Sequence, residues 1–251
     1  MRRALVAGNW KMNGSQASIK SLMSDLLPAL AKGINGVDVV VCPPYPYLGQ
    51  VAEAAYGSEI VLGAQDLSEE SSGAYTGEVD GGMLVDFRVR FVLVGHSERR
   101  ERCGEGDEQV AKKFAAAQAA GLIPVLCVGE SLNHRQSGHA EDVVATQLTA
   151  VIERCGIQAF ADAVIAYEPV WAIGTGEAAS AEDAQQMHAF IRQVVAQADA
   201  SIANSVQILY GGSVNAGNAE ALFACEDIDG GLVGGASLKA DDFIRICQSV
   251  S

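Results

Sequence analysis

The sequence predicts a closed (β/α)8 barrel, the α/β fold in which eight parallel strands form a wall surrounded by helices. Eight short apolar runs recur along the 251 residues, with starts roughly 25–45 residues apart, which leaves room for a strand, a helix and two loops. The runs are continuous rather than alternating, as in strands that are buried on both faces. The alternative is a doubly wound open sheet.

The expected strands are residues 4–8, 37–42, 60–64, 91–95, 123–128, 164–167, 206–210 and 231–233. Apolar residues at helical spacing lie between them and predict buried helix faces. The clearest such faces are Ile19, Leu22, Met23, Leu26, Leu27 and Leu30, then Leu148, Val151 and Ile152, then Met187, Phe190, Ile191, Val194 and Val195. No composition shift, charge block or linker marks a boundary, so we expect one catalytic domain over residues 1–251.

Composition and charge limit the classes of partner. The chain is 49% hydrophobic, which is ample for a large core. Its net charge is -14 and its isoelectric point about 4.6, which argues against nucleic-acid or anionic-membrane partners because both need a basic surface. An anionic substrate would therefore need local positive potential.

The cysteines and histidines indicate neither a metal site nor a disulfide framework. The six cysteines form no C-x-x-C pair, and none clusters with the four histidines. Free thiols are typical of a reducing compartment. The apolar stretch after Met1 is too short for a signal peptide, and the longest uncharged run is too short for a membrane span. We therefore expect a cytoplasmic protein without a metal.

Residues 164–177 indicate a catalytic base beneath a lid. The sixth run ends at Glu168, and Pro169 stops the strand. Residues 170–173 are apolar where a loop is normally polar, and they are followed by Gly174 and Gly176. Taken alone, the stretch also fits a buried strand with an incidental glutamate. Residues 174–179 match a loose G-x-G-x-x-A dinucleotide pattern but do not directly follow a strand, so we predict that they bind no dinucleotide.

Other chemically useful residues also follow strands, whose carboxyl ends meet on one face of a barrel. They are Asn9 and Lys11 after the first run, His96 after the fourth, Ser213 after the seventh, and Gly234 and Gly235 at the end of the eighth. The turns at 211–213 and 234–235 predict a phosphate cradle of backbone N–H groups at helix starts. The alternative is two tight turns that need positive φ.

The roles of three of these residues can be narrowed. His96 precedes an expected helix, which favours a neutral imidazole that donates a hydrogen bond, although a simple helix cap is equally consistent. Glu98 either pairs with Lys11 or caps its own helix. A Schiff-base role for Lys11 is conceivable, but nothing else in the sequence requires it. Together with Glu168 and the cradle, these residues imply proton transfer beside a carbonyl on a small phosphorylated substrate.

The sequence resembles the triosephosphate isomerase family over essentially its whole length. The motifs that carry the resemblance are G-N-W-K-M-N at 8–13, G-H-S-E-R-R at 95–100, A-Y-E-P-V-W-A-I-G-T-G at 166–176, Y-G-G-S-V at 210–214 and G-L-V-G-G-A-S-L at 231–238. The resemblance implies interconversion of dihydroxyacetone phosphate and D-glyceraldehyde 3-phosphate through an enediolate, in glycolysis and gluconeogenesis, without cofactor or metal.

The same resemblance implies roles that spacing alone does not give. Glu168 looks like the base and His96 like the electrophile, while Lys11 and Asn9 look like substrate and enediolate stabilisers. The implied phosphate binders are Gly174, Ser213, Gly234 and Gly235, and Cys127 matches a cysteine with a structural role near the base. The family forms homodimers through the loop at residues 65–78, where Thr76 matches the residue that reaches the partner's Lys11.

The chain departs from the family in two places and leaves two rival functions open. It reads Ala64-Gln65-Asp66, whereas the family commonly has asparagine at the third of these positions. We hypothesise that Asp66 lies in the dimer interface with a raised pKa, so that Asp66→Asn raises the melting temperature. Glu177 stands where the family frequently has a basic residue, and we have no functional account of this difference. The rivals are another phosphate-binding barrel enzyme, such as a Schiff-base aldolase, and a non-catalytic barrel scaffold.

Overall fold

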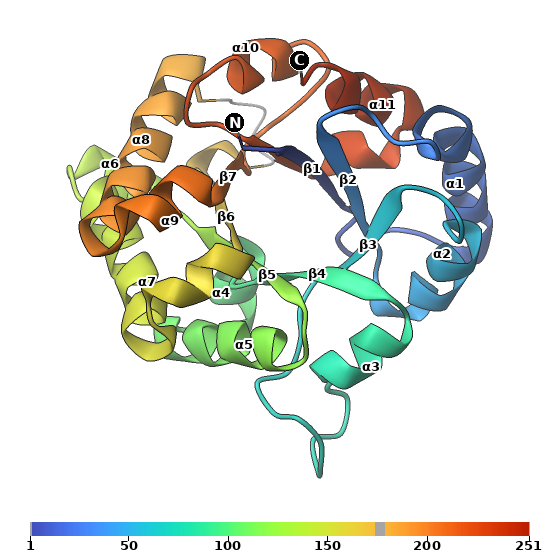
Figure 1. Ribbon diagram of the computed structural model, residues 1–251, viewed down its shortest axis with the longest axis horizontal. Coiled ribbons are helices and arrows are strands. Elements are labelled where there is room, and N and C mark those ends of the chain that lie inside the picture. The colour runs from blue at the N-terminus through green and yellow to red at the C-terminus, as the bar shows by residue number, and fades with distance from the viewer. Residues whose placement is uncertain (1, 174–178, 251) are drawn as a thin grey trace.

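The computed structural model is a closed barrel of eight parallel strands that pair in chain order, β1 to β8 and back to β1 (Figure 1). It describes residues 2–173 and 179–250. The strands are β1 (Ala4–Asn9), β2 (Val37–Cys42), β3 (Ile60–Ala64), β4 (Val89–Val94), β5 (Ile123–Val128), β6 (Val164–Tyr167), β7 (Gln207–Tyr210) and β8 (Gly230–Val233). The predicted barrel is confirmed, and the doubly wound open sheet is excluded.

Five strand boundaries, in four strands, differ from the predicted ones. β4 ends at Val94 because Gly95 has φ 71°, a left-handed conformation that cannot continue a strand. β4 also begins two residues earlier than expected, and β1 continues to Asn9. β7 begins one residue later than predicted. β8 begins one residue earlier, at Gly230, where an added Cβ would lie 2.0 Å from the carbonyl oxygen of Leu5 on β1, so only glycine fits this close approach.

Helices form a ring outside the barrel (Figure 1). They are α1 (Gln16–Leu30), α2 (Leu48–Ala54), α3 (Gly81–Asp86), α4 (Ser97–Cys103), α5 (Asp107–Ala119), α6 (Leu132–Gln136), α7 (Ala140–Cys155), α8 (Ala181–Ala198), α9 (Ala200–Ser205), α10 (Ala219–Phe223) and α11 (Ala240–Gln248). Short 3₁₀ turns are η1 (Tyr45–Tyr47), η2 (Ile157–Asp162), η3 (Val170–Ala172) and η4 (Gly235–Leu238). The expected face of α1 is confirmed, with Ile19, Met23, Leu26 and Leu30 all buried.

The strands are buried on both faces, which explains their continuous apolar sequences. One cluster fills the barrel and includes Leu5, Val40, Leu93 and Leu209. A larger cluster lies between the strands and the surrounding helices. Successive strand residues alternate between the two clusters, so each strand needs apolar residues at every position.

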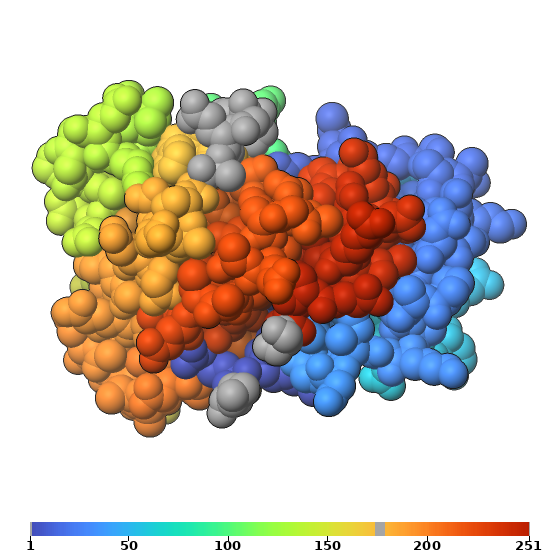
Figure 2. All heavy atoms as spheres, turned by 90° about the horizontal axis from the view of Figure 1, so that it is seen from above, coloured from blue at the N-terminus to red at the C-terminus, as the bar shows by residue number. Residues whose placement is uncertain are grey.

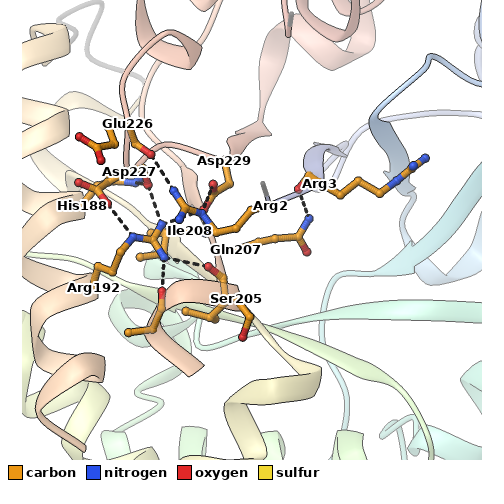
Figure 3. A network of polar contacts seen from close by, with 12 residues as sticks. Arg2, Arg3, His188, Arg192, Ser205, Gln207, Ile208, Glu226, Asp227 and Asp229 are labelled. Carbon is orange, nitrogen blue, oxygen red and sulfur yellow. Dashed lines mark hydrogen bonds and ion pairs between the residues drawn. The ribbon is translucent and has the colours of Figure 1, made fainter. Parts of the chain in front are cut away.

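The barrel closes where the two ends of the chain meet. The N-terminal elements (blue) and C-terminal elements (red) lie side by side on the outer surface (Figure 2). Between β7 and β8 the register contains one residue pair, Tyr210 with Gly231. A polar network beside the short β7–β8 pairing adds further contacts (Figure 3). Asp229, the residue before β8, accepts from Arg2 Nε at 2.6 Å, from an Nη of Arg192 at 2.9 Å and from the backbone N–H of Ile208 on β7 at 2.8 Å. Asp229 therefore ties the N-terminus, α8 and β7 together.

Within residues 2–173 and 179–250, no helix combines the length and apolar character that crossing a membrane requires.

Candidate active site

The carboxyl ends of the strands surround a cavity of about 420 Å³. It brings together nearly all the site residues expected from the sequence. Its lining includes Asn9, Lys11, His96, Glu168, Ser213, Gly234 and Gly235. Gly174, which the resemblance also assigns to the phosphate site, lies outside the described residues, as does Glu177. The apolar segment before Gly174 contributes Ile173 to the lining.

Glu168 is a buried carboxylate held in place by two donors. Its Oε1 lies 2.9 Å from His96 Nε2, and its Oε2 accepts the backbone N–H of Ser97 at 2.8 Å. Burial raises the pKa of Glu168, but His96 and the Ser97 N–H outweigh burial and lower the pKa below its usual value. The residue is thus a carboxylate at neutral pH, the form that a general base requires.

His96 uses its two ring nitrogens differently. Nδ1 accepts the backbone N–H of Glu98 at 3.2 Å, while Nε2 faces Glu168. Burial lowers the pKa of His96, but the Glu168 carboxylate outweighs burial and raises it. The geometry at Nδ1 opposes an imidazolium, because a protonated Nδ1 would face another donor. From these hydrogen bonds we assign the neutral ring with its proton on Nε2.

Lys11 is an ammonium fixed at both its backbone and its side chain. Its Nζ lies 2.6 Å from Glu98 Oε1, so Glu98 pairs with Lys11, which settles the choice that the sequence left open. The Lys11 backbone N–H donates to Asn9 Oδ1 at 3.0 Å. Lys11 has φ 50°, a left-handed conformation that is rare for a residue with a side chain.

Crowding, not positive φ, explains two glycines of the predicted phosphate cradle, Gly211 and Gly212, whereas an added Cβ at Gly234 or Gly235 would meet nothing closer than 3.6 Å. None of the cradle's four glycines has a positive φ: Gly211, Gly212, Gly234 and Gly235. A Cβ at Gly211 would lie 2.9 Å from Glu168 Cγ, and one at Gly212 would lie 2.2 Å from Tyr210 Oη. The expectation that both turns lead directly into helices is correct only for the second turn, where Gly234 precedes η4 and Gly235 is its first residue. The helix after Ser213 begins at Ala219.

The two remaining predicted residues, Cys127 and Thr76, do not line the cavity. Cys127 is fully buried inside the barrel, and burial raises the pKa of its thiol well above the usual range, so it is an inert thiol. Thr76 is exposed in the loop between β3 and α3, which extends away from the barrel (Figure 1).

Glu130 is a site residue that the sequence interpretation missed. It follows β5 and is completely buried. Its Oε1 accepts from Trp171 Nε1 at 2.8 Å and from the Tyr167 hydroxyl at 3.1 Å. Glu130 thereby holds η3, the apolar segment beside the base, in its present position. The available signal was another carboxylate close to the end of a strand, two residues after Val128.

Asp66 is buried among charged side chains of its own chain. Its carboxylate accepts from Lys113 Nζ at 2.7 and 2.8 Å and lies 2.9 Å from an Nη of Arg99. Glu105 contacts the same two cations, at 2.6 Å from Lys113 and 2.7 Å from Arg99. Burial does raise the pKa of Asp66, but the acid is buried with two cations of its own chain. The raised pKa agrees with our hypothesis, and the place of Asp66 in a dimer interface stays a prediction.

No group of histidine, cysteine and acidic residues suited to a metal ion occurs in the described parts of the chain, 2–173 and 179–250.

Comparison with known proteins agrees with the site. The sequence profile described as triosephosphate isomerase matches residues 4–250. The chain is 57% identical to the triosephosphate isomerase of Thiobacillus denitrificans over the full length of both chains. It is 54% identical to that of Alcanivorax borkumensis, over 99% of this chain and 98% of the relative. It is 55% identical to that of Stenotrophomonas maltophilia, over 100% and 99%. A barrel with these strand-end residues, matched over its whole length, belongs to the triosephosphate isomerase family.

Proposed function

We propose that Glu168 moves the proton when this chain interconverts dihydroxyacetone phosphate and D-glyceraldehyde 3-phosphate, the isomerisation that defines its family. The observation that carries the proposal is a buried carboxylate at the cavity wall, 2.9 Å from a neutral histidine. Glu168 leaves His96 and Ser97, takes a proton from the carbon beside the carbonyl, and returns it to the neighbouring carbon.

His96 and Lys11 stabilise the negative charge that develops on the substrate oxygens. The Nε2–H of His96 donates to the oxygen that becomes an enediolate, and the Lys11 ammonium adds a nearby positive charge. When Glu168 turns toward the substrate, the main cause that raises the His96 pKa is removed, while burial and Lys11 still lower it. The ring therefore stays neutral during proton transfer, and Asn9 fixes the Lys11 backbone.

The phosphate lies at the other end of the cavity, against backbone N–H groups near Ser213, Gly234 and Gly235. An added Cβ at Gly234 would come within 3.6 Å of Lys11 Cε, so this backbone lies close to the ammonium. Oriented amides and one cation supply local positive potential on a chain of net charge -14. Gly174 completes the cradle in this proposal.

We also propose that the chain works as a cytoplasmic homodimer with a single catalytic domain. Apolar side chains are exposed on the extended loop and on α3, including Tyr75 at 46%, Met83 at 51% and Val85 at 44%. Exposed apolar surface of this kind favours a protein partner. Thr76 lies in the same loop and would reach the partner's Lys11. Six free cysteines are consistent with a reducing compartment.

The two rival functions fit the geometry less well. A Schiff-base aldolase needs an uncharged amine, whereas Lys11 forms an ion pair with Glu98. A non-catalytic scaffold does not need Glu168, His96 and Lys11 to converge on one cavity, as they do here.

The direct test compares the wild type with Glu168→Gln in an assay that couples glyceraldehyde 3-phosphate isomerisation to a dehydrogenase. Glutamine keeps the size and removes the base, so turnover should fall at least about 10³-fold while the fold persists. Comparable turnover in the two proteins would exclude Glu168 as the base. Slow turnover in both would instead exclude this substrate.

A further inference from the structure

Gln65 contacts the backbone of Lys11 from a neighbouring strand end. The residue directly follows β3, and its Nε2 donates to the carbonyl oxygens of Lys11 and Cys42, each at 2.9 Å. Both protons of the side-chain amide are therefore used, and one group joins the ends of β1, β2 and β3. Gln65 lies in the Ala64-Gln65-Asp66 segment, of which the third residue departs from the family pattern.

Lys11 needs such support because its backbone is unfavourable. A left-handed φ of 50° brings Cβ close to the backbone, and a lysine adopts it only when its surroundings enforce it. Asn9 holds the N–H of Lys11, Glu98 holds its ammonium, and Gln65 holds its carbonyl. The carbonyl contact fixes the peptide plane that follows Lys11, so it bears directly on the conformation that directs Nζ into the cavity.

Gln65 is itself well anchored. The next residue, Asp66, is clamped by Lys113 and Arg99, both outside the β3 strand. The Tyr45 hydroxyl also donates to the Asp66 carbonyl. A side chain that starts from so fixed a backbone can impose a position on its neighbour at little cost in conformational entropy.

We propose that Gln65 is a positioning residue for the isomerase: its amide holds Lys11 in the left-handed conformation that places the ammonium against the substrate. Gln65 is not part of the cavity lining and acts through Lys11. The inference rests on the proposed role of Lys11 in binding substrate and stabilising the enediolate.

The first experiment replaces the amide by an apolar side chain of similar length, Gln65→Met. Lys11 should then sample other conformations, so kcat should fall and KM should rise, together lowering kcat/KM by about 10²-fold, the loss expected of a misplacement near 1 Å. The matched control is Gln50→Met. The Gln50 amide likewise donates to a backbone carbonyl, that of Gln16 at 2.8 Å, but away from the cavity. The control should keep wild-type kinetics. Unchanged kcat/KM in a folded Gln65→Met protein would overturn the inference.

A double-mutant cycle shows whether Gln65 acts through Lys11. Lys11→Gly removes both the ammonium and the need for positive-φ support, so adding Gln65→Met to it should cost less than about twofold more. If the two losses simply multiply, Gln65 acts elsewhere and the inference fails. If Lys11→Gly alone leaves kcat/KM intact, the proposed role of Lys11 fails with it. If Lys11→Gly alone is severe and Gln65→Met is harmless, only the inference fails.

A second variant covers the case in which Gln65→Met does not fold. In Gln65→Glu, the carboxylate cannot donate to either carbonyl, whereas its protonated form regains one donor. Relative to wild type, kcat/KM should be low at pH 8 and recover partly toward pH 5. A ratio to wild type that does not change with pH would contradict the positioning role.

Discussion

At the scale of single residues, the position of the Glu168 carboxylate matters as much as its charge. The carboxylate now bonds His96 and Ser97 and must turn from them toward a substrate carbon. Catalysis by proton transfer depends on sub-ångström placement of the base, because donor and acceptor must approach within hydrogen-bond distance. The length of the side chain is therefore a sensitive test of its role.

Shortening the base tests this placement. Glu168→Asp retains the charge but withdraws the carboxylate by roughly 1 Å, which should cost about 10²-fold in kcat. The melting temperature should change little, so steady-state kinetics beside thermal unfolding separate placement from stability. Near-wild-type turnover in this variant would mean that Glu168 is not the base.

His188 illustrates a buried residue whose effect is on stability. It lies edge-on to Tyr167, and Nδ1 donates to the Asp227 carbonyl at 3.2 Å (Figure 3). Burial lowers the pKa of His188 to about 4, well below the ordinary value of 6.5. Between these two pH values His188 is therefore protonated in the unfolded chain but neutral in the folded chain. Stability is lost as the pH falls from about 6.5 toward 4.

This linkage predicts that the free energy of unfolding of His188→Gln falls less than that of the wild type as the pH is lowered. In the wild type, His188 should account for a loss of about 2 kcal/mol in the free energy of unfolding between pH 7 and pH 5. The variant should lack that loss, whatever its stability at pH 7. Urea unfolding at both pH values measures the difference, with exposed His139→Gln as control. The same pH dependence in His188→Gln and wild type would contradict the assignment.

At the scale of elements, α4 carries a disproportionate share of the site. Its start supplies the Ser97 N–H to Glu168, the Glu98 N–H to His96 and the Glu98 carboxylate to Lys11. The helix has seven residues, too few to be stable alone. Its position depends on tertiary contacts, and Arg99, bound to Asp66 and Glu105, provides one of them.

The cluster around Arg99 reverses the expectation for Asp66→Asn. The raised pKa of Asp66 means that burying its charge has a cost, which asparagine would remove. Asparagine would also turn an amide donor toward Lys113 or Arg99 and leave Glu105 as the one carboxylate that contacts both cations, which we expect to cost more than removing the buried charge gains. We expect the melting temperature at pH 7 to fall by several degrees, with exposed Asp86→Asn unchanged. A higher melting temperature for Asp66→Asn would support the earlier interface hypothesis.

At the scale of the whole molecule, the barrel makes one site from residues far apart in sequence. The architecture was predictable because strands buried on both faces leave continuous apolar runs, and every predicted strand boundary was correct within two residues. The convergence of Asn9, His96 and Glu168 follows from the same topology, since all three lie at or just after the carboxyl ends of parallel strands.

What sequence reasoning missed depends on specific long-range partners. Gln65 bonds the carbonyl of a residue 54 positions away, and Asp66 meets Lys113 at a separation of 47. A single sequence shows an amide and an acid after a strand but not which side chains face them. The left-handed backbone of Lys11 likewise cannot be predicted from the residue type, because the surrounding contacts impose that conformation on a lysine.

The measurement that tests the central claim most directly follows the proton itself. Dihydroxyacetone phosphate is converted in D₂O, and NMR spectroscopy reads deuterium at the reacting carbons. The account predicts that the wild type incorporates deuterium from solvent, since a carboxylate that carries the proton exchanges it, and that Glu168→Gln slows incorporation at least about 10³-fold. Incorporation by Glu168→Gln at the wild-type rate would show that another group moves the proton, and the assignment of Glu168 as base would be wrong.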